Sequence, residues 1–157
     1  MSAPRSNIAQ LNVARFQRPK DDPANAGFMH ALDHVNAQAD AADGFIWRLV
    51  GDGNNATDVE IVRGDPDLIV NLSVWRDVAA LEAFAYRQAD HRAMLARRAE
   101  WFAPMEPSLA LWEVPEEHEP SVAEAMAKLA QLGRDGPSAA VFTFKWWRAN
   151  RSGAVQG

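Results

Sequence analysis

The sequence predicts an α+β domain with the ferredoxin-like element order β-α-β-β-α-β, followed by a C-terminal helix and strand. Short runs with a hydrophobic period of two, typical of strands, alternate with longer runs that repeat every three or four residues, typical of helices. With 157 residues, 48% of them hydrophobic and 24% charged, the chain is long enough to form its own core. We therefore expect one antiparallel four-stranded sheet with helices on one face.

The expected strands span residues 8–16, 45–50, 68–75 and 109–114, with a last edge strand over 140–147. Asp22 followed by Pro23 is the pattern of an N-cap and a first helical residue, so the first helix begins there. Its apolar stripe consists of Phe28, Leu32, Val35 and Ala39. The helix is expected to end before Gly44.

The later helices begin at residues that favour helix N-termini. Asp77 and Asp90 are expected caps, and Ser121 with Glu124 three positions later forms a capping box. Gly133 is the expected end of that last helix. Residues 1–148 are then one domain and residues 149–157 a disordered tail.

The predicted strands have two unlike faces. Residues 9, 11, 13, 68, 70, 72 and 74 are apolar, and they alternate with Gln10, Asn12, Ile69, Asn71, Ser73 and Trp75. A face with amides, a hydroxyl and an indole but no charge suggests a partly enclosed pocket. We expect the apolar faces to meet the helices. The mixed faces then need a second subunit, and two sheets in a C2 homodimer would enclose a barrel lumen.

Composition narrows the class of function. The net charge of −5 and the pI near 5.3 argue against nucleic acid or an anionic membrane as partner. No cysteine is present, and no apolar run has the length of a membrane helix. His30 and His34 have the spacing of a metal pair but no third ligand, so no metal is predicted. We expect a cytoplasmic protein that acts on a small molecule. The polar connection from Gly51 to Asp67 is either a functional lid or an interface arm.

His91 is the principal candidate for chemistry. A helix that begins near Asp90 places it on one face with Leu95, Arg98 and Phe102. Such a histidine can act as a general base or bind haem or a metal, and Arg98 can hold an acidic group. The alternative is a core histidine with satisfied hydrogen bonds and Arg98 in a structural ion pair.

The strand amides form a second candidate group, which consists of Gln10, Asn12 and Asn71 with the Ser73 hydroxyl. Neutral donors of this kind polarise a carbonyl or stabilise an enolate oxygen. A hydrogen-bond network between subunits explains the same residues equally well.

Six tryptophans are many for this length. Trp75, Trp101 and Trp112 fall near element ends, where they can form the walls of a pocket for a flat ligand, although core or dimer packing explains each one as well. Trp47 and Arg48 lie on opposite faces of their strand, and the sequence leaves open which one faces the lumen. Arg48 suits a carboxylate and Trp47 an aromatic ligand.

Five motifs occur in order: Gly44-Phe45-Ile46-Trp47-Arg48-Leu49, Asn71-Leu72-Ser73-Val74-Trp75, His91 with Arg98 and Trp101-Phe102, Leu111-Trp112-Glu113-Val114-Pro115, and Gly136-Pro137-Ser138 with Phe142-Thr143-Phe144. Together they resemble an uncharacterised bacterial family that carries a domain-of-unknown-function label. That family is grouped with the dimeric α+β-barrel superfamily, alongside antibiotic-biosynthesis monooxygenases. The resemblance implies the barrel fold and the homodimer.

The superfamily contains cofactor-free monooxygenases of aromatic polyketides, haem-degrading and haem peroxidase-like enzymes, and small lyases and isomerases. This chain looks similar to the haem-degrading branch at Asn12 and His91. Its run from Trp75 leads to Phe84, however, where that branch has a helical tryptophan. By analogy with the monooxygenases, the resemblance implies that Asn12, Trp47 and Trp75 bind a carbanion-forming aromatic substrate.

Our leading hypothesis is cofactor-independent oxidation of a compact aromatic or polyketide-like substrate in the barrel lumen. His91 acts as general base or orienter, Asn12 and Asn71 stabilise an oxyanion, and Arg98 binds an acidic group. The alternatives are a non-redox cyclase, lyase or isomerase, a haem protein with His91 as axial ligand, and a non-catalytic ligand-binding dimer.

Overall fold

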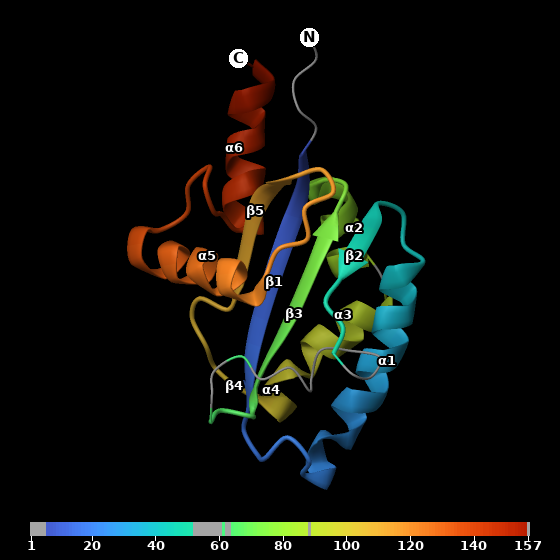
Figure 1. Cartoon of the computed structure of the whole chain (residues 1–157). Coiled ribbons are helices and arrows are strands. Elements are labelled where there is room, and N and C mark those ends of the chain that lie inside the picture. The colour runs from blue at the N-terminus through green and yellow to red at the C-terminus, as the bar shows by residue number, and fades with distance from the viewer. Residues whose placement is uncertain (1–5, 52–60, 62–63, 88, 157) are drawn as a thin grey trace.

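The computed structural model describes residues 6–51, 61, 64–87 and 89–156, without the side chains at 89–91 and 152–156 (Figure 1). The strands are β1 (Ser6–Phe16), β2 (Phe45–Arg48), β3 (Leu68–Trp75), β4 (Phe102–Ala103) and β5 (Leu109–Pro115). The helices are α1 (Ala26–Asp40), α2 (Val78–Arg87), α3 (Ala89–Ala96), α4 (Arg98–Trp101), α5 (Val122–Asp135) and α6 (Phe144–Gln156), with a 3-10 turn, η1 (Pro23–Asn25), before α1. None of these described helices is long and apolar enough to span a bilayer.

The sheet has the ferredoxin-like strand order and is antiparallel throughout. β1 pairs with β3 on one side and with β5 and the short β4 on the other, and β2 is the edge strand beyond β3. In the register of β1 with β3, Asn12 lies opposite Asn71 and Gln10 opposite Ser73. The pairing therefore places all the predicted strand amides near the centre of one face, and the predicted α+β class is confirmed.

The apolar face of the sheet packs against α5 (Figure 1). The buried cluster at this interface includes Ala9, Leu11, Val13, Leu72, Val74, Trp112, Ala125, Leu129, Leu132 and Val141. Strand alternation aims one side chain in two at α5, and the apolar stripe of the helix closes the layer. The apolar face thus meets one helix, α5, and not the whole helix layer that was predicted for it.

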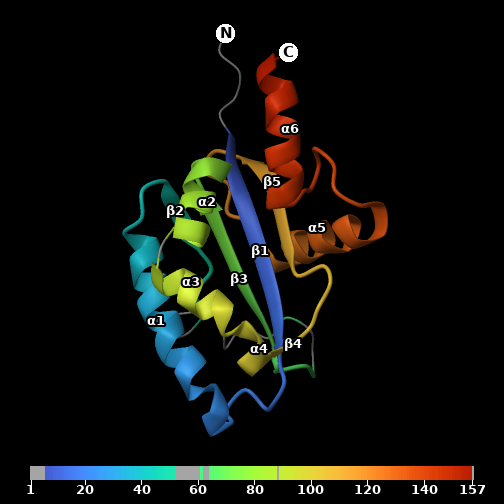
Figure 2. The same ribbon diagram turned by 180° about the vertical axis from the view of Figure 1, so that it is seen from behind.

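The mixed face is also covered by helices of the same chain, contrary to prediction. Helices α1, α2 and α3 lie across it, on the side of the sheet opposite α5 (Figure 2). The error has a physical cause: the apolar stripes of α1 and α2 need a surface to pack on, and Ile8, Ile69 and Trp75 supply apolar area within the mixed face. A second subunit is therefore not required to cover this face.

Three of the four predicted helix caps are present, at Asp22, Asp77 and Ser121, whereas the predicted cap Asp90 is wrong, because it lies within α3, which begins at Ala89. Asp22 Oδ1 accepts from the Ala24 backbone N–H at 2.8 Å, and Ser121 Oγ accepts from Glu124 N–H at 3.0 Å. The expected end at Gly133 is wrong, because α5 continues to Asp135 and ends at Gly136, which has a φ of 78°. A Cβ at position 133 would lie 3.3 Å from Pro107 Cδ, so Gly133 serves close packing instead.

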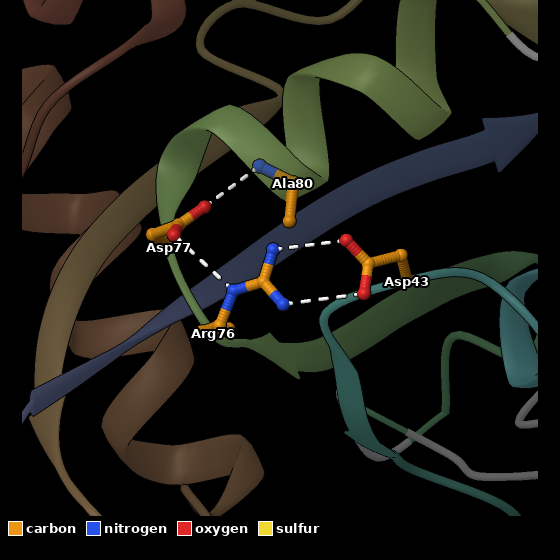
Figure 3. Close-up of polar contacts among 4 residues, drawn as sticks. All are labelled: Asp43, Arg76, Asp77 and Ala80. Atoms are coloured by element: carbon orange, nitrogen blue, oxygen red, sulfur yellow. Dashed lines mark hydrogen bonds and ion pairs between the residues drawn. The ribbon is translucent and has the colours of Figure 1, made fainter.

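A polar corner fixes the passage from β3 into α2 (Figure 3). Arg76 donates two hydrogen bonds to the Asp43 carboxylate, at 3.2 and 3.0 Å, and Asp77 caps α2 by accepting from Ala80 N–H at 2.8 Å. The Arg76 guanidinium holds the pKa of the Asp43 carboxyl below its usual range. Gly44 has a φ of 85°, and a Cβ there would lie 2.5 Å from Ala80 Cβ, so only glycine fits this turn.

The predicted C-terminal edge strand is wrong. Phe142 makes a single antiparallel bridge with Leu111, and the chain then turns into α6 at Phe144. Thr143 Oγ1 accepts from Trp146 N–H at 3.1 Å and so caps the helix, which ends strand pairing after one bridge. The backbone of α6 includes residues 149–156, the segment predicted to be a disordered tail.

Candidate functional site

A cavity of about 470 Å³ lies between the mixed face of the sheet and the helix layer. The sheet contributes Gln10, Asn12, Asn71, Ser73 and Trp75, which we call the floor. The facing side chains come mainly from α1 and α2, including Phe28, Leu32, Val35, Leu81 and Phe84. The cavity therefore belongs to a single chain, and the predicted location in a lumen between two subunits is wrong.

The floor contains a hydrogen-bond network centred on the Ser73 hydroxyl. Gln10 Nε2 donates to Ser73 Oγ at 2.8 Å and to Asn71 Oδ1 at 2.6 Å, and Trp75 Nε1 donates to Ser73 Oγ at 2.9 Å. The Ser73 oxygen thus accepts two hydrogen bonds, and its own proton stays free to donate. The network fixes the position of the hydroxyl oxygen, and its O–H can donate to a ligand in the cavity.

Asn12 and Asn71 add two amide donors to the floor. The two residues lie opposite each other in the register of β1 and β3, and both line the cavity. Within the described residues neither Nδ2 donates a hydrogen bond; the only bond formed by either side-chain amide is the one that Asn71 Oδ1 accepts from Gln10. Asn71 is exposed, so the cavity is open to solvent at this point. The floor therefore presents several uncharged donors to a ligand.

Aromatic rings surround these donors. Phe45 and Phe84 both contact the Trp75 indole, with centroid distances of 5.3 and 5.4 Å. Phe28 and Phe102 pack edge to face at 4.9 Å at another part of the wall. Such walls favour a flat apolar ligand.

Arg48, rather than Trp47, faces the cavity. The side chain of Arg48 is only 10% exposed and donates to both carboxylate oxygens of Asp40, at 2.7 and 3.1 Å. A bulge between Phe45 and Trp47 turns the edge strand, and Trp47 packs against the apolar cluster beneath α5. Arg98 also lines the cavity, whose described lining contains no aspartate or glutamate.

Trp101 and Trp112 do not line the cavity, contrary to prediction. Trp101 is buried against Phe28, with a centroid distance of 5.5 Å. Trp112 lies beneath α5 and donates to Glu124 Oε2 at 3.1 Å, and Glu124 Oε1 is 2.8 Å from His118 Nε2. Partial burial raises the pKa of Glu124, but the hydrogen bonds from His118 and Trp112 outweigh it, so this pKa lies below its usual range.

The sequence of this chain matches one known protein family. The sequence profile described as "Domain of unknown function (DUF3291)" matches residues 7–155. The chain belongs to the DUF3291 family. No curated protein matches it.

Several solved structures are similar to this DUF3291 protein over about three quarters of its length. SnoaB from Streptomyces nogalater, described as a cofactor-independent oxygenase, aligns with 14% identity and a TM-score of 0.50, over 74% of this chain and 99% of SnoaB. A candidate antibiotic biosynthesis monooxygenase from Nitrosomonas europaea aligns with 12% identity and a TM-score of 0.50, over 77% of this chain and 99% of its own. Rv0793 from Mycobacterium tuberculosis aligns with 16% identity and a TM-score of 0.50, over 73% of this chain and 99% of its own. At these identities the likeness establishes the fold alone.

The side chain of His91 lies outside the described residues, so its role stays a prediction. Its backbone is part of α3, and the other members of its predicted face, Leu95, Arg98 and Phe102, all line the cavity. The haem hypothesis depends on His91 and stays a prediction as well. Most of the connection from Gly51 to Asp67 also lies outside the described residues. Its predicted role, as a lid or as an interface arm, therefore stays a prediction.

Sequence reasoning missed Asn36, a polar residue in the wall. Asn36 lies on α1, is only 4% exposed and lines the cavity. It is one helical turn beyond Leu32 and beside Val35, within the stripe that we read as wholly apolar. An asparagine inside an apolar stripe was the available signal.

Proposed function

We propose that this DUF3291 protein is a small-molecule enzyme that binds a compact aromatic substrate between its sheet and its helices and promotes the reaction of that substrate with O₂ without a cofactor. One observation carries the proposal: a cluster of uncharged hydrogen-bond donors lies on the floor of a cavity whose walls are aromatic and aliphatic. The structural likeness to SnoaB supports it.

The floor is suited to stabilise a substrate anion. Loss of an acidic C–H proton beside a carbonyl gives a carbanion whose charge moves onto the carbonyl oxygen. Asn12, Asn71 and the Ser73 hydroxyl can donate to that oxygen. Gln10 holds Asn71 and Ser73 in place, and donors that are already in place need little reorganisation. Loss of one such donor typically lowers kcat by about 10²–10³-fold.

An oxidation of this kind balances without an external reductant. A methylene group reacts as R₂CH₂ + O₂ → R₂C=O + H₂O. The carbon loses four electrons, one oxygen atom enters the product, and the other leaves as water with the two hydrogens. The substrate therefore supplies all the electrons, and the protein needs only to bind it, stabilise its anion and accept the proton.

We propose His91 as the group that accepts this proton, on sequence grounds. Its predicted partners on the same helix face, Leu95 and Arg98, line the cavity. The test is His91→Ala, which we expect to abolish turnover while the protein stays folded by circular dichroism. A fully active His91→Ala variant would remove this role and leave the floor donors unaffected.

The proposal is tested with anthrone, a tricyclic ketone with an acidic methylene opposite its carbonyl. We expect the wild-type protein to accelerate anthraquinone formation above the spontaneous rate in air, with one ¹⁸O atom incorporated from ¹⁸O₂. EDTA should leave the rate unchanged. Asn71→Leu and Asn12→Leu should each lower kcat by about 10²-fold. Asn150→Leu, which removes an exposed amide on α6, is the control.

Two results would overturn the proposal. Folded wild-type protein that gives only the spontaneous rate, with anthrone and with hydroxylated analogues, would remove the enzymatic function. Proton exchange or isomerisation of the substrate without O₂ uptake would replace oxidation by non-redox chemistry at the same site.

A further inference from the structure

Asn36 is a largely buried polar residue in the wall of the cavity. It is 4% exposed and lines the cavity, and within the described residues its side chain makes no hydrogen bond. Asn25, near the start of α1, behaves differently, because its Nδ2 donates to the Pro19 carbonyl at 2.9 Å, although its Oδ1 is buried without a partner in the described part of the chain. Asn25 thus ties one segment of backbone to another, and Asn36 does not.

An unpartnered amide at this position requires an explanation outside the chain. Burial of an amide is unfavourable unless it forms hydrogen bonds, and leucine has both a higher helix propensity and a better fit to an apolar stripe. The nearest members of the stripe, Leu32 and Val35, are apolar and line the same cavity. The position therefore serves a group that enters the cavity.

We propose that Asn36 determines specificity by donating a hydrogen bond to an oxygen on the ligand edge that faces the helix layer. The inference rests on the proposed function for the place where the ligand binds. The floor donors Asn12 and Asn71 come from the sheet, and Asn36 comes from the layer packed against it. The ligand class is therefore a flat ring system with oxygen acceptors at two opposite edges.

The rest of the lining fits this class. Apart from Asn36 and the floor donors, much of the lining consists of rings such as Phe28, Phe45 and Phe84, which can pack against an apolar ring system. The described lining holds no carboxylate that would repel electron-rich oxygens, and it does include Arg48 and Arg98. A ligand with one oxygen would leave either Asn36 or the floor without a partner.

The test compares two ligands on one carbon skeleton. 1,4-Naphthoquinone carries carbonyl oxygens on opposite edges of a ring, and 1-tetralone carries one; the chain has no cysteine, so no thiol consumes the quinone. Affinities are measured by quenching of tryptophan fluorescence for wild type, Asn36→Leu and Asn36→Asp. The control is His30→Leu, an apolar replacement on the exposed side of the same helix.

We expect wild type to bind the quinone more tightly than the tetralone. Asn36→Leu and Asn36→Asp should weaken quinone binding roughly tenfold, as expected for one hydrogen bond, and leave tetralone binding within twofold. His30→Leu should change neither affinity. Asn36→Leu should also unfold at the same temperature as wild type or higher, because it removes an unpartnered amide; a merely structural Asn36 would make this variant less stable.

The outcomes separate this inference from the proposed function. Wild type that binds both ligands equally, or an Asn36→Leu variant that weakens both equally or neither, would overturn the role of Asn36 and leave the aromatic site in place. Wild type that binds neither ligand and does not turn over anthrone would overturn the proposed function itself.

Discussion

The two faces of this sheet are both covered by helices, but they are built for different purposes. Beneath α5 the strand side chains are apolar and buried, with Leu11 and Leu72 at 0% and 1% exposure. Beneath α1, α2 and α3 the same strands carry amides and a hydroxyl, and a cavity of about 470 Å³ stays between the layers.

The difference shows where stability and binding reside in the fold. A close-packed face gains dispersion and hydrophobic energy from nearly every side chain, whereas the atoms that line a cavity lack partners on one side. The chain thus places its most complete packing on the α5 face. The α1–α3 face gives up part of that packing and offers donors to a ligand.

The largest expected effect compares one substitution on the two faces. Leu72→Ala, in the buried apolar cluster on the α5 side of the sheet, should lower the free energy of unfolding by about 4 kcal/mol, because it opens a void in a close-packed layer. Leu81→Ala, in the cavity wall, should cost about 2 kcal/mol, since Leu81 already has fewer neighbours on one side. Urea denaturation measures both.

The two variants should rank in the opposite order when their ligand affinities, rather than their unfolding free energies, are compared. Under conditions where both are folded, Leu72→Ala should bind 1,4-naphthoquinone as wild type does, and Leu81→Ala should bind it more weakly. Equal unfolding free energies for the two variants would show that the faces do not differ in packing as described.

An effect of intermediate magnitude is expected from two tryptophans, one on each face of the sheet. Trp75 and Trp112 are both buried, and each indole N–H donates one hydrogen bond, to Ser73 and to Glu124 respectively. Replacement of either by phenylalanine should cost about 1–3 kcal/mol, as a lost hydrogen bond and a small void would. Only Trp75→Phe should weaken quinone binding, measured by calorimetry. Weaker binding in Trp112→Phe would contradict its place outside the cavity.

The smallest expected effect is a pH dependence on the α5 face. The pKa of Glu124 is lowered in the folded protein, so its carboxylate stabilises the fold above the ordinary pKa of a glutamate, and this contribution disappears as the pH falls through the lowered value. The difference in unfolding free energy between wild type and Glu124→Gln should shrink as the pH falls below about 4.5, by less than about 1 kcal/mol in total. A difference that grows on acidification would reverse the assigned sign.

The homodimer predicted from sequence stays a prediction, but its proposed geometry changes. Closure of the mixed face by a partner is not needed, because α1, α2 and α3 already cover that face. On the opposite face α5 packs beside β5 and β1. Light scattering of the full chain tests the association itself.

Much of the architecture followed from local patterns. The alternation in residues 8–13 and 68–75 predicted both strands and their unlike faces, and Asp77 and Ser121 predicted helix starts that the hydrogen bonds confirm. The strand amides were predicted to gather, and the register of Asn12 with Asn71 brings them together. These features succeed because period and capping depend on neighbours in sequence.

Other assignments failed where distant residues decide. The sequence could not tell Trp47 from Arg48 as the residue in the pocket, because a bulge sets the facing of that short edge strand. The sequence also placed Trp112 in the pocket, because a tryptophan is compatible with either buried face of the sheet. The run from Ala140 to Trp147 has strand composition, yet a single bridge and the Thr143 cap turn it into a helix.

The sequence by itself therefore determined the α+β class, the order of the strands along the chain and the chemistry of each strand face, since these depend on spacing within a segment. Only the tertiary structure decided which face the helices cover, and with it the place of the cavity between the layers of one chain. It alone joined Asn36 to the strand amides, 24 or more residues away in sequence, because long-range packing sets which layers face each other.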